Sequence, residues 1–181
     1  QSALLESMQE RQVTIGDDSY KLDTPFLVLA TQNPIDQEGT YPLPEAQRDR
    51  FMMKLNISYP SKEEELKIMQ RMADMNFKKS TKTVLNKKDI MSIQGEINKV
   101  SISESIEKYI IEIVTATRNP SSVKLDELKS FISFGASPRA SINLSLAAKA
   151  NAFLSNRDYV IPDDIKEIAN DVLNHRIILN Y

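Results

Sequence analysis

The sequence predicts a short α/β segment over residues 1–59 followed by an all-α domain over residues 60–181, so that the chain is predominantly helical. Two observations predict this division. A hairpin pattern and a continuous apolar run occupy the first part, whereas the second part carries apolar stripes at helical spacing with capping residues before them. The boundary falls at Tyr59-Pro60, because proline removes a backbone donor and ends the strand pattern before it.

The first part begins with a helical pattern and a hairpin pattern. Residues 1–10 place apolar side chains at helical spacing, and no capping residue precedes them, so we expect the chain to start inside a domain. The runs RQVTI and SYKL then flank Gly16-Asp17-Asp18. Glycine and aspartate tolerate the positive φ of a tight turn, so this pattern predicts a β-hairpin.

Two further strands are predicted before the boundary. Phe26 to Ala30 is a continuous apolar run of strand length, typical of a strand covered on both faces in a parallel sheet. A loop rich in proline, glutamine and glycine leads into a short helix around Pro44 to Arg50. Residues 51–57 alternate well enough for a second strand.

The second part shows the starts of several helices. Ser61 with Glu64, and Ser101 with Glu104, have the spacing of a capping box. Ser137-Pro138 and Pro162-Asp163 predict two further helix starts, because proline is tolerated in the first turn. Two apolar stripes indicate the buried faces of the bundle: Ile102, Ile106, Tyr109, Ile110, Ile113 and Val114, and then Ile142, Leu146, Ala150 and Phe153.

Composition excludes several classes of function. The chain has 23 basic and 25 acidic residues, so its net charge of -2 offers no overall attraction to nucleic acid or anionic membrane. It has no cysteine and one histidine, His175, which argues against disulfides and a metal centre, and we interpret His175 as a packing or surface residue. No apolar stretch approaches the roughly 20 residues that span a bilayer. A cytoplasmic protein without membrane insertion is expected.

A phosphate-binding loop is missing from the sequence. No GxxxxGK[ST] pattern occurs, and the glycines are not grouped into a phosphate cradle. Gly95-Glu96 superficially suggests a magnesium-binding DE motif. It lacks the aspartate and lies in an amphipathic pattern, so we do not interpret it as a metal site.

Three residues are candidates for chemistry. Asn33 follows the apolar run, at the strand end where open α/β sheets bind ligands, although Asn-Pro also starts turns. Arg50 follows the short helix, and its fork of donors suits a phosphoryl group, although most exposed arginines are solvated charges. Arg139 lies in the first turn of a predicted helix, where free backbone donors and a cation attract an anion; a plain surface arginine is the alternative.

Several segments read in order resemble the second half of MoxR-family AAA+ ATPases: LLESMQERQVTI, LATQNP, EGTYPLPEAQRDRF, FGASPRA and HR. The resemblance runs through nearly the whole chain. It implies the C-terminal part of the P-loop ATPase core, with a presensor hairpin, over residues 1–59 and a helical AAA+ lid over residues 60–181. The phosphate loop and the DE motif would then precede Gln1, so the chain alone is expected to be inactive and to bind no cofactor tightly.

The resemblance also implies roles for the three candidates. Asn33 in ATQNP matches the first sensor, which positions the attacking water, and Arg50 in DRF matches the arginine finger. Arg139 in SPRA matches the second sensor. Catalytic roles thus fall on Asn33 and Arg50, and nucleotide contacts on all three. Arg48 stands where an apolar residue is usual and is a competing cation, but the DRF match favours Arg50; Ile161 replaces a more usual threonine cap.

The family further implies cofactors and partners. The intact protein would use ATP and Mg²⁺ in a homo-oligomeric ring, expected to be a hexamer, in which one subunit supplies Arg50 to the next. Arg139 would meet the nucleotide of its own subunit or of a neighbour. Remodelling or maturation of client proteins, alongside proteins with von Willebrand factor A domains, is the implied function.

Two rival hypotheses remain. The helical part could be a protein-interaction module that works without nucleotide, which a longer chain would test by ATP binding and turnover. A nucleic-acid motor could use the hairpin on DNA, but the acidic tip Gly16-Asp17-Asp18 would be repelled by phosphates. Nucleic acid is therefore not expected as a partner.

Overall fold

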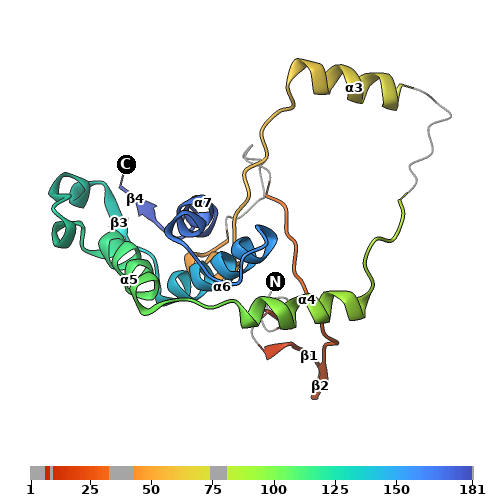
Figure 1. Cartoon of the computed structure of the whole chain (residues 1–181), viewed down its shortest axis with the longest axis horizontal. Coiled ribbons are helices and arrows are strands. Elements are labelled where there is room, and N and C mark those ends of the chain that lie inside the picture. Colours follow the sequence, from red (N-terminus) through yellow and green to blue (C-terminus); the bar gives the residue numbers. More distant parts are fainter. Residues whose placement is uncertain (1–6, 9, 33–42, 74–80, 181) are drawn as a thin grey trace.

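The predicted hairpin is present near the N-terminus. A computed structural model of the chain describes residues 7–8, 10–32, 43–73 and 81–180. Strand β1 (Gln12–Ile15) pairs antiparallel with β2 (Asp18–Lys21), and Val13 lies opposite Tyr20 (Figure 1). Gly16 adopts a φ of 65° in the connecting turn, which is the left-handed conformation that favours glycine. Of the predicted helix over residues 1–10, the described residues 7, 8 and 10 are helical.

The two other predicted strands do not form. Residues 26–30 and 51–57 pair with no strand in the described part of the chain. Leu29 is 86% exposed and Ile57 is 95% exposed, so neither segment is covered on both faces. The physical reason is that an apolar run becomes a strand only when neighbouring strands satisfy its backbone donors and acceptors. Such neighbours are absent among the described residues.

Helix α3 (Lys62–Met72) begins at the predicted capping box. Ser61 N–H donates to Glu64 Oε2 at 2.9 Å, and Glu64 N–H donates to Ser61 Oγ at 3.3 Å. The helix lies apart from the others in Figure 1, and none of its residues is buried. Helix α4 (Lys87–Lys99) contains Gly95-Glu96, as expected, and Asn86 is its N-cap.

Helix α5 (Glu104–Arg118) begins at a different serine from the one predicted. Its N-cap is Ser103, whose hydroxyl accepts from Ile106 N–H at 3.4 Å, so the predicted box of Ser101 with Glu104 is wrong. Ser101 instead donates its backbone N–H to Asp158 O at 2.8 Å in a bridge to a distant loop. Because Ser101 is engaged in this long-range backbone pairing, it does not cap α5, and Ser103 does.

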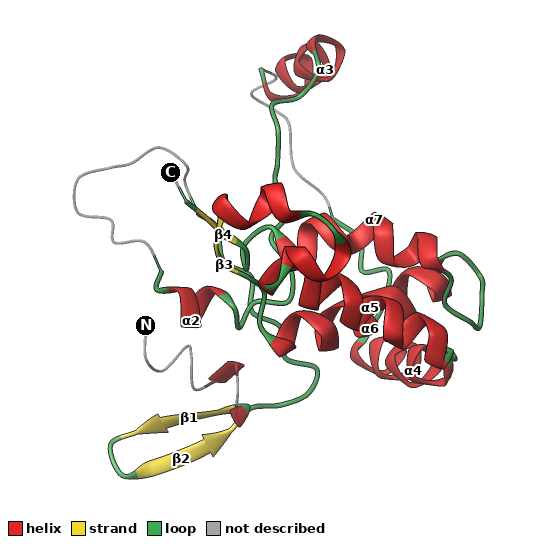
Figure 2. Ribbon diagram, turned by 90° about the vertical axis from the view of Figure 1, so that its left-hand side faces the viewer, coloured by secondary structure: helices red, strands yellow, loops and turns green. Residues whose placement is uncertain are grey.

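The core lies between α5, α6 (Pro138–Leu154) and α7 (Pro162–Leu173), with α6 packed against both neighbours (Figure 2). The predicted face of α5 is confirmed, since Ile106, Ile110 and Val114 are buried. The predicted face of α6 is wrong in its first half, although Phe153 at its end does pack against the core. Ile142 is 60% exposed and Leu146 is 46% exposed, whereas the buried face consists of Ala140, Leu144, Ala147, Ala148 and Ala152. Small side chains let α6 approach both neighbouring helices closely, so the buried face is not the most hydrophobic one.

Both predicted proline starts are confirmed, at Pro138 and Pro162. The residue before Pro162, Ile161, has no side-chain acceptor, and the Asp164 carboxylate accepts its backbone N–H at 2.9 Å instead. Arg157 completes this junction with an ion pair to Asp164 at 2.5 Å, and hydrogen bonds from Arg157 lower the pKa of the Asp164 carboxyl. The helix start is thus satisfied without a threonine.

The remaining elements close the ends of the bundle. Two 3₁₀ turns, η1 (Pro120–Val123) and η2 (Asp126–Ser130), lead into β3 (Ile132–Phe134), which pairs antiparallel with β4 (Ile178–Leu179). The segment after helix α2 (Glu45–Arg48) lies against α6 and α7, where Ser137 donates to Asp49 and Lys54 N–H donates to Asp171 O at 2.8 Å. None of the described helices is long and apolar enough to cross a membrane.

We expect Gly135→Ala to destabilise the fold. A Cβ at residue 135 would lie 2.4 Å from Thr117 O, which is backbone at the end of α5 and cannot move aside cheaply. The cost should be about 1–3 kcal/mol in the free energy of unfolding measured by denaturant titration. Gly95→Ala is the matched control: its Cβ meets nothing within 4 Å, and it should stabilise α4 by about 0.5–1 kcal/mol. Equal effects of the two changes would contradict the packing described here.

Candidate functional site

Two of the predicted site residues meet at one pocket. Arg50, which follows α2, and Arg139, in the first turn of α6, line an open cavity of about 230 Å³ together with Met8, Ile142 and Asn143. The exposed Ile142 that was expected in the core is thus part of this pocket. Asn33 lies outside the described residues. The competing cation Arg48 is not among the pocket residues, so the pocket favours Arg50.

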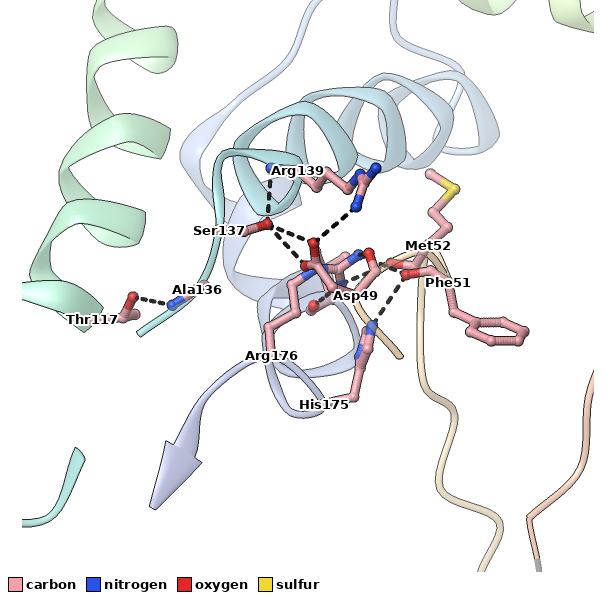
Figure 3. Close-up of polar contacts among 10 residues, drawn as sticks. Asp49, Phe51, Met52, Thr117, Ala136, Ser137, Arg139, His175 and Arg176 are labelled. Carbon is pink, nitrogen blue, oxygen red and sulfur yellow. Dashed lines mark hydrogen bonds and ion pairs between the residues drawn. The ribbon is translucent and has the colours of Figure 1, made fainter. Parts of the chain in front are cut away.

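The start of α6 fixes the position of Arg139. Ser137 is extended, with φ -73° and ψ 169°, and its hydroxyl accepts the backbone N–H of Arg139 at 3.2 Å. Just before it, Ala136 N–H donates to Thr117 Oγ1 at 2.9 Å, which ties the loop to α5 (Figure 3). The guanidinium of Arg139 therefore extends from a capped helix start, where the positive end of the helix dipole also lies.

A single carboxylate, that of Asp49, joins the elements that carry the two arginines. Ser137 Oγ donates to its two oxygens at 2.9 and 2.8 Å, and Arg139 Nη1 lies 3.5 Å from Oδ2. Arg176 Nε donates to Oδ1 at 3.0 Å (Figure 3). Because Asp49 immediately precedes Arg50, this carboxylate connects the Arg50 segment with α6 and with the turn after α7.

The side chain of Arg176 is fully buried and saturated with acceptors. Besides Asp49 Oδ1, its guanidinium donates to Phe51 O at 2.6 Å, to Asp49 O at 3.1 Å, to Met52 O at 3.3 Å and to Val172 O. Its exposed fraction is 0%. Burial lowers the pKa of Arg176, and the charge of Asp49 opposes that shift. Arg176 therefore holds the main chain of residues 49–52 against α7.

His175 is a packing residue, and it contacts the same segment. It is 8% exposed, and its Nε2 lies 3.1 Å from Phe51 O. Since a carbonyl only accepts, Nε2 carries the proton. The other ring nitrogen, Nδ1, is buried and has no hydrogen-bond partner among the described residues. Burial is the main cause that lowers the pKa of His175, followed by the charge of Arg176.

Sequence reasoning missed Asp49 and Arg176. Both residues stood inside quoted motifs, DRF and HR, but no local pattern assigns a role to either. Their side chains meet across 127 positions of sequence, and a buried arginine cannot be distinguished from a surface arginine by spacing. The available signal was that His175 and Arg176 lie between the apolar residues Leu173 and Ile177.

The pocket is suited to an anion with several oxygens. Two arginines line it, and a guanidinium is a planar set of donors that matches phosphate or carboxylate. Asp49, 18% exposed at its side chain, balances only part of the positive charge of Arg139 and Arg176. The Arg139 side chain is 44% exposed, so it can reach a ligand from solvent.

Comparisons with known proteins show the family of the chain. The family model of the ATPase family associated with various cellular activities (AAA) matches residues 1–53, and that of the AAA lid domain matches residues 128–181. The chain is 47% identical to Chaperone MoxR1 of Mycobacterium tuberculosis, over 100% of this chain and 48% of the relative. The chain belongs to the MoxR family of AAA+ ATPases.

Other MoxR-family relatives extend the comparison. YeaC of Bacillus subtilis is 47% identical over 99% of the chain and 53% of its own length, and MoxR of Methylorubrum extorquens is 30% identical over 97% and 54%. A crystal structure of a candidate ATPase from Cytophaga hutchinsonii has a TM-score of 0.93 and 63% identity, covering 99% of this chain and 55% of that one. The chain spans about half the length of these relatives.

The burial of His175 predicts a loss of stability at mildly acidic pH. Its pKa is lowered in the folded chain, so as the pH falls through the ordinary value of 6.5 the unfolded chain takes up a proton and the folded chain does not. The free energy of unfolding should then fall by at most about 1.4 kcal/mol per pH unit, until the pH reaches the lowered pKa. Denaturant titrations between pH 7.5 and 5 measure the loss.

The variant His175→Gln is the control for this titration. Its amide can still donate to Phe51 O, and the chain then contains no histidine. The pH dependence that His175 causes should vanish in this variant. An unchanged slope would contradict the buried, neutral imidazole.

Proposed function

We propose that this chain is the C-terminal portion of a MoxR-type ATPase, in which Arg50 and Arg139 read and complete an ATP site. The observation that carries the proposal is the shared pocket, because two arginines from separate elements line one open cavity. A phosphoryl group gathers charge on its oxygens during transfer, and such a pair stabilises that charge. Asn33, which follows the segment 26–32, would orient the attacking water.

The shared pocket also favours one subunit's nucleotide as the one that Arg139 contacts. If Arg50 reaches into a neighbour's site, as a finger does, then Arg139 on the same pocket reaches the same nucleotide. The two arginines therefore act together and in trans. Arg48 has no part in this contact, since it does not line the pocket.

The remaining groups of the site come from outside this sequence. No GxxxxGK[ST] pattern occurs in it, so the phosphates and Mg²⁺ would be held by another part of the protein or by another subunit. The chain alone is then inactive, and activity requires a ring, for which six subunits are the family expectation. We further propose that the ring remodels or matures client proteins in the cytoplasm, alongside partners with von Willebrand factor A domains. The name of one relative, Chaperone MoxR1, supports a role on client proteins.

The substitutions Arg50→Ala and Arg139→Ala in the full-length protein test the proposal. Loss of an arginine finger costs about 10³ to 10⁵ in kcat, and we expect Arg50→Ala to approach that range. Arg139→Ala should lower kcat by at least about ten-fold, the effect of a lost charged hydrogen bond. Arg118→Ala, an exposed arginine at the end of α5, is the matched control and should turn over ATP normally.

Mixed rings decide whether Arg139 acts in trans. Subunits with a defective phosphate loop but intact arginines are mixed with Arg139→Ala subunits. If Arg139 serves a neighbour, the mixture regains turnover, because interfaces form with an intact loop on one side and Arg139 on the other. No recovery would place Arg139 in its own subunit's site. Absence of ATP binding and turnover in the unchanged full-length protein would favour the nucleotide-independent interaction module.

A further inference from the structure

We propose that Asp49, anchored by Arg176, is the positioning residue of the arginine pair. It connects the segment that carries Arg50 with the helix start that carries Arg139, and we call this set of contacts the frame. It also holds the Arg139 guanidinium in place until a phosphate binds that guanidinium instead. This inference deepens the proposed function and rests on it. Three observations support it: the anchoring of the Arg50 segment, the hydroxyl bridge to α6, and the long contact to Arg139.

The anchoring of the Arg50 segment comes from Arg176. Its guanidinium binds the main-chain carbonyls of Asp49, Phe51 and Met52, so it holds the chain on both sides of Arg50. The donating side chain is 0% exposed, so water cannot replace these acceptors. A guanidinium that is shielded from solvent needs a hydrogen-bond acceptor for each N–H. Arg176 can therefore be buried only while residues 49–52 stay in the position that supplies these acceptors.

The bridge to α6 passes through Ser137. Its hydroxyl donates to Asp49 at 2.8 Å and accepts from Arg139 N–H at 3.2 Å, so a single group joins the carboxylate to the backbone of Arg139. The Asp49 carboxylate thus connects the chain beside Arg50 to the helix start that carries Arg139. Neither connection depends on a bound ligand. The frame is therefore present before nucleotide arrives.

The direct contact between Asp49 and Arg139 is weaker than the other two. Arg139 Nη1 lies 3.5 Å from Asp49 Oδ2, at the limit of a hydrogen bond, and the Arg139 side chain is 44% exposed. A phosphate carries more negative charge and offers several acceptors, so it competes well for this guanidinium. When Arg139 leaves, Asp49 keeps Ser137 and Arg176. The guanidinium can therefore change partner while the frame stays in place.

The test uses Asp49→Asn and Ser137→Ala in the full-length protein. Asp49→Asn removes the charge with little change of shape. Ser137→Ala removes the hydroxyl that bridges Asp49 to α6 and also caps that helix, so the two variants break the connection at different points. Asp164→Asn is the matched control, because Asp164 is also in a largely buried ion pair, with Arg157, but away from the pocket. It should lower stability without affecting the arginine pair.

The first readout is amide hydrogen exchange without nucleotide. Asp49→Asn and Ser137→Ala should raise exchange at residues 50–53 and 139–141 by about ten-fold or more, the effect of a lost charged hydrogen bond, and Asp164→Asn should leave these amides unchanged. Unchanged exchange in both site variants would overturn the inference. This readout does not depend on ATP turnover, so it separates failure of the frame from failure of the proposed function.

The second readout is a double-mutant cycle with Arg139→Ala in steady-state turnover. If Asp49 acts through Arg139, Asp49→Asn lowers kcat by about ten-fold or more, with a smaller change in KM, and the double variant loses less than the product of the single losses. Independent, multiplying losses would mean that Asp49 has only a structural role, and would overturn the inference. Normal turnover by Arg50→Ala and Arg139→Ala themselves would instead overturn the proposed function.

Discussion

The buried guanidinium of Arg176 is the constraint on which the functional end of this molecule depends. Taking an arginine out of water is costly unless every donor finds an acceptor and a negative charge lies close. Here the acceptors are carbonyls of the chain around Arg50 and the charge is that of Asp49. No strand in the described part of the chain pairs with the segment between α2 and α3, so this ion pair and its hydrogen bonds supply the restraint.

Local signals in the sequence predicted the elements whose causes are local. The capping box of α3, the proline starts of α6 and α7 and the hairpin turn at Gly16 each depend on residues within four positions of one another. The failures have causes at long range. Residues 26–30 have a strand pattern but no neighbouring strand, Ser101 pairs with Asp158, and α6 buries alanines because of how closely its neighbours approach.

In the candidate site, too, some residues could be predicted from local motifs, whereas others depend on long-range contacts. Arg50 and Arg139 could be predicted because they stand in long motifs that resemble a known family, and the pocket places them together. Asp49 and Arg176 could not be assigned roles, since their meaning lies in a contact across 127 positions. Burial likewise decides the state of His175. It lowers the pKa of the imidazole, and the spacing of residues in the sequence does not indicate that burial.

If Arg139 binds a phosphate, as we propose, the carboxylate beside it has a further physical consequence. Asp49 competes with the ground-state phosphate for Arg139, which weakens binding, but it also limits the orientations that the guanidinium can adopt. Only interactions that strengthen in the transition state accelerate a reaction. As negative charge gathers on the transferred oxygens, the attraction of Arg139 to the phosphoryl group grows relative to its attraction to Asp49. An arginine held by a weak internal partner is therefore better suited to sensing that charge than one held tightly or left free.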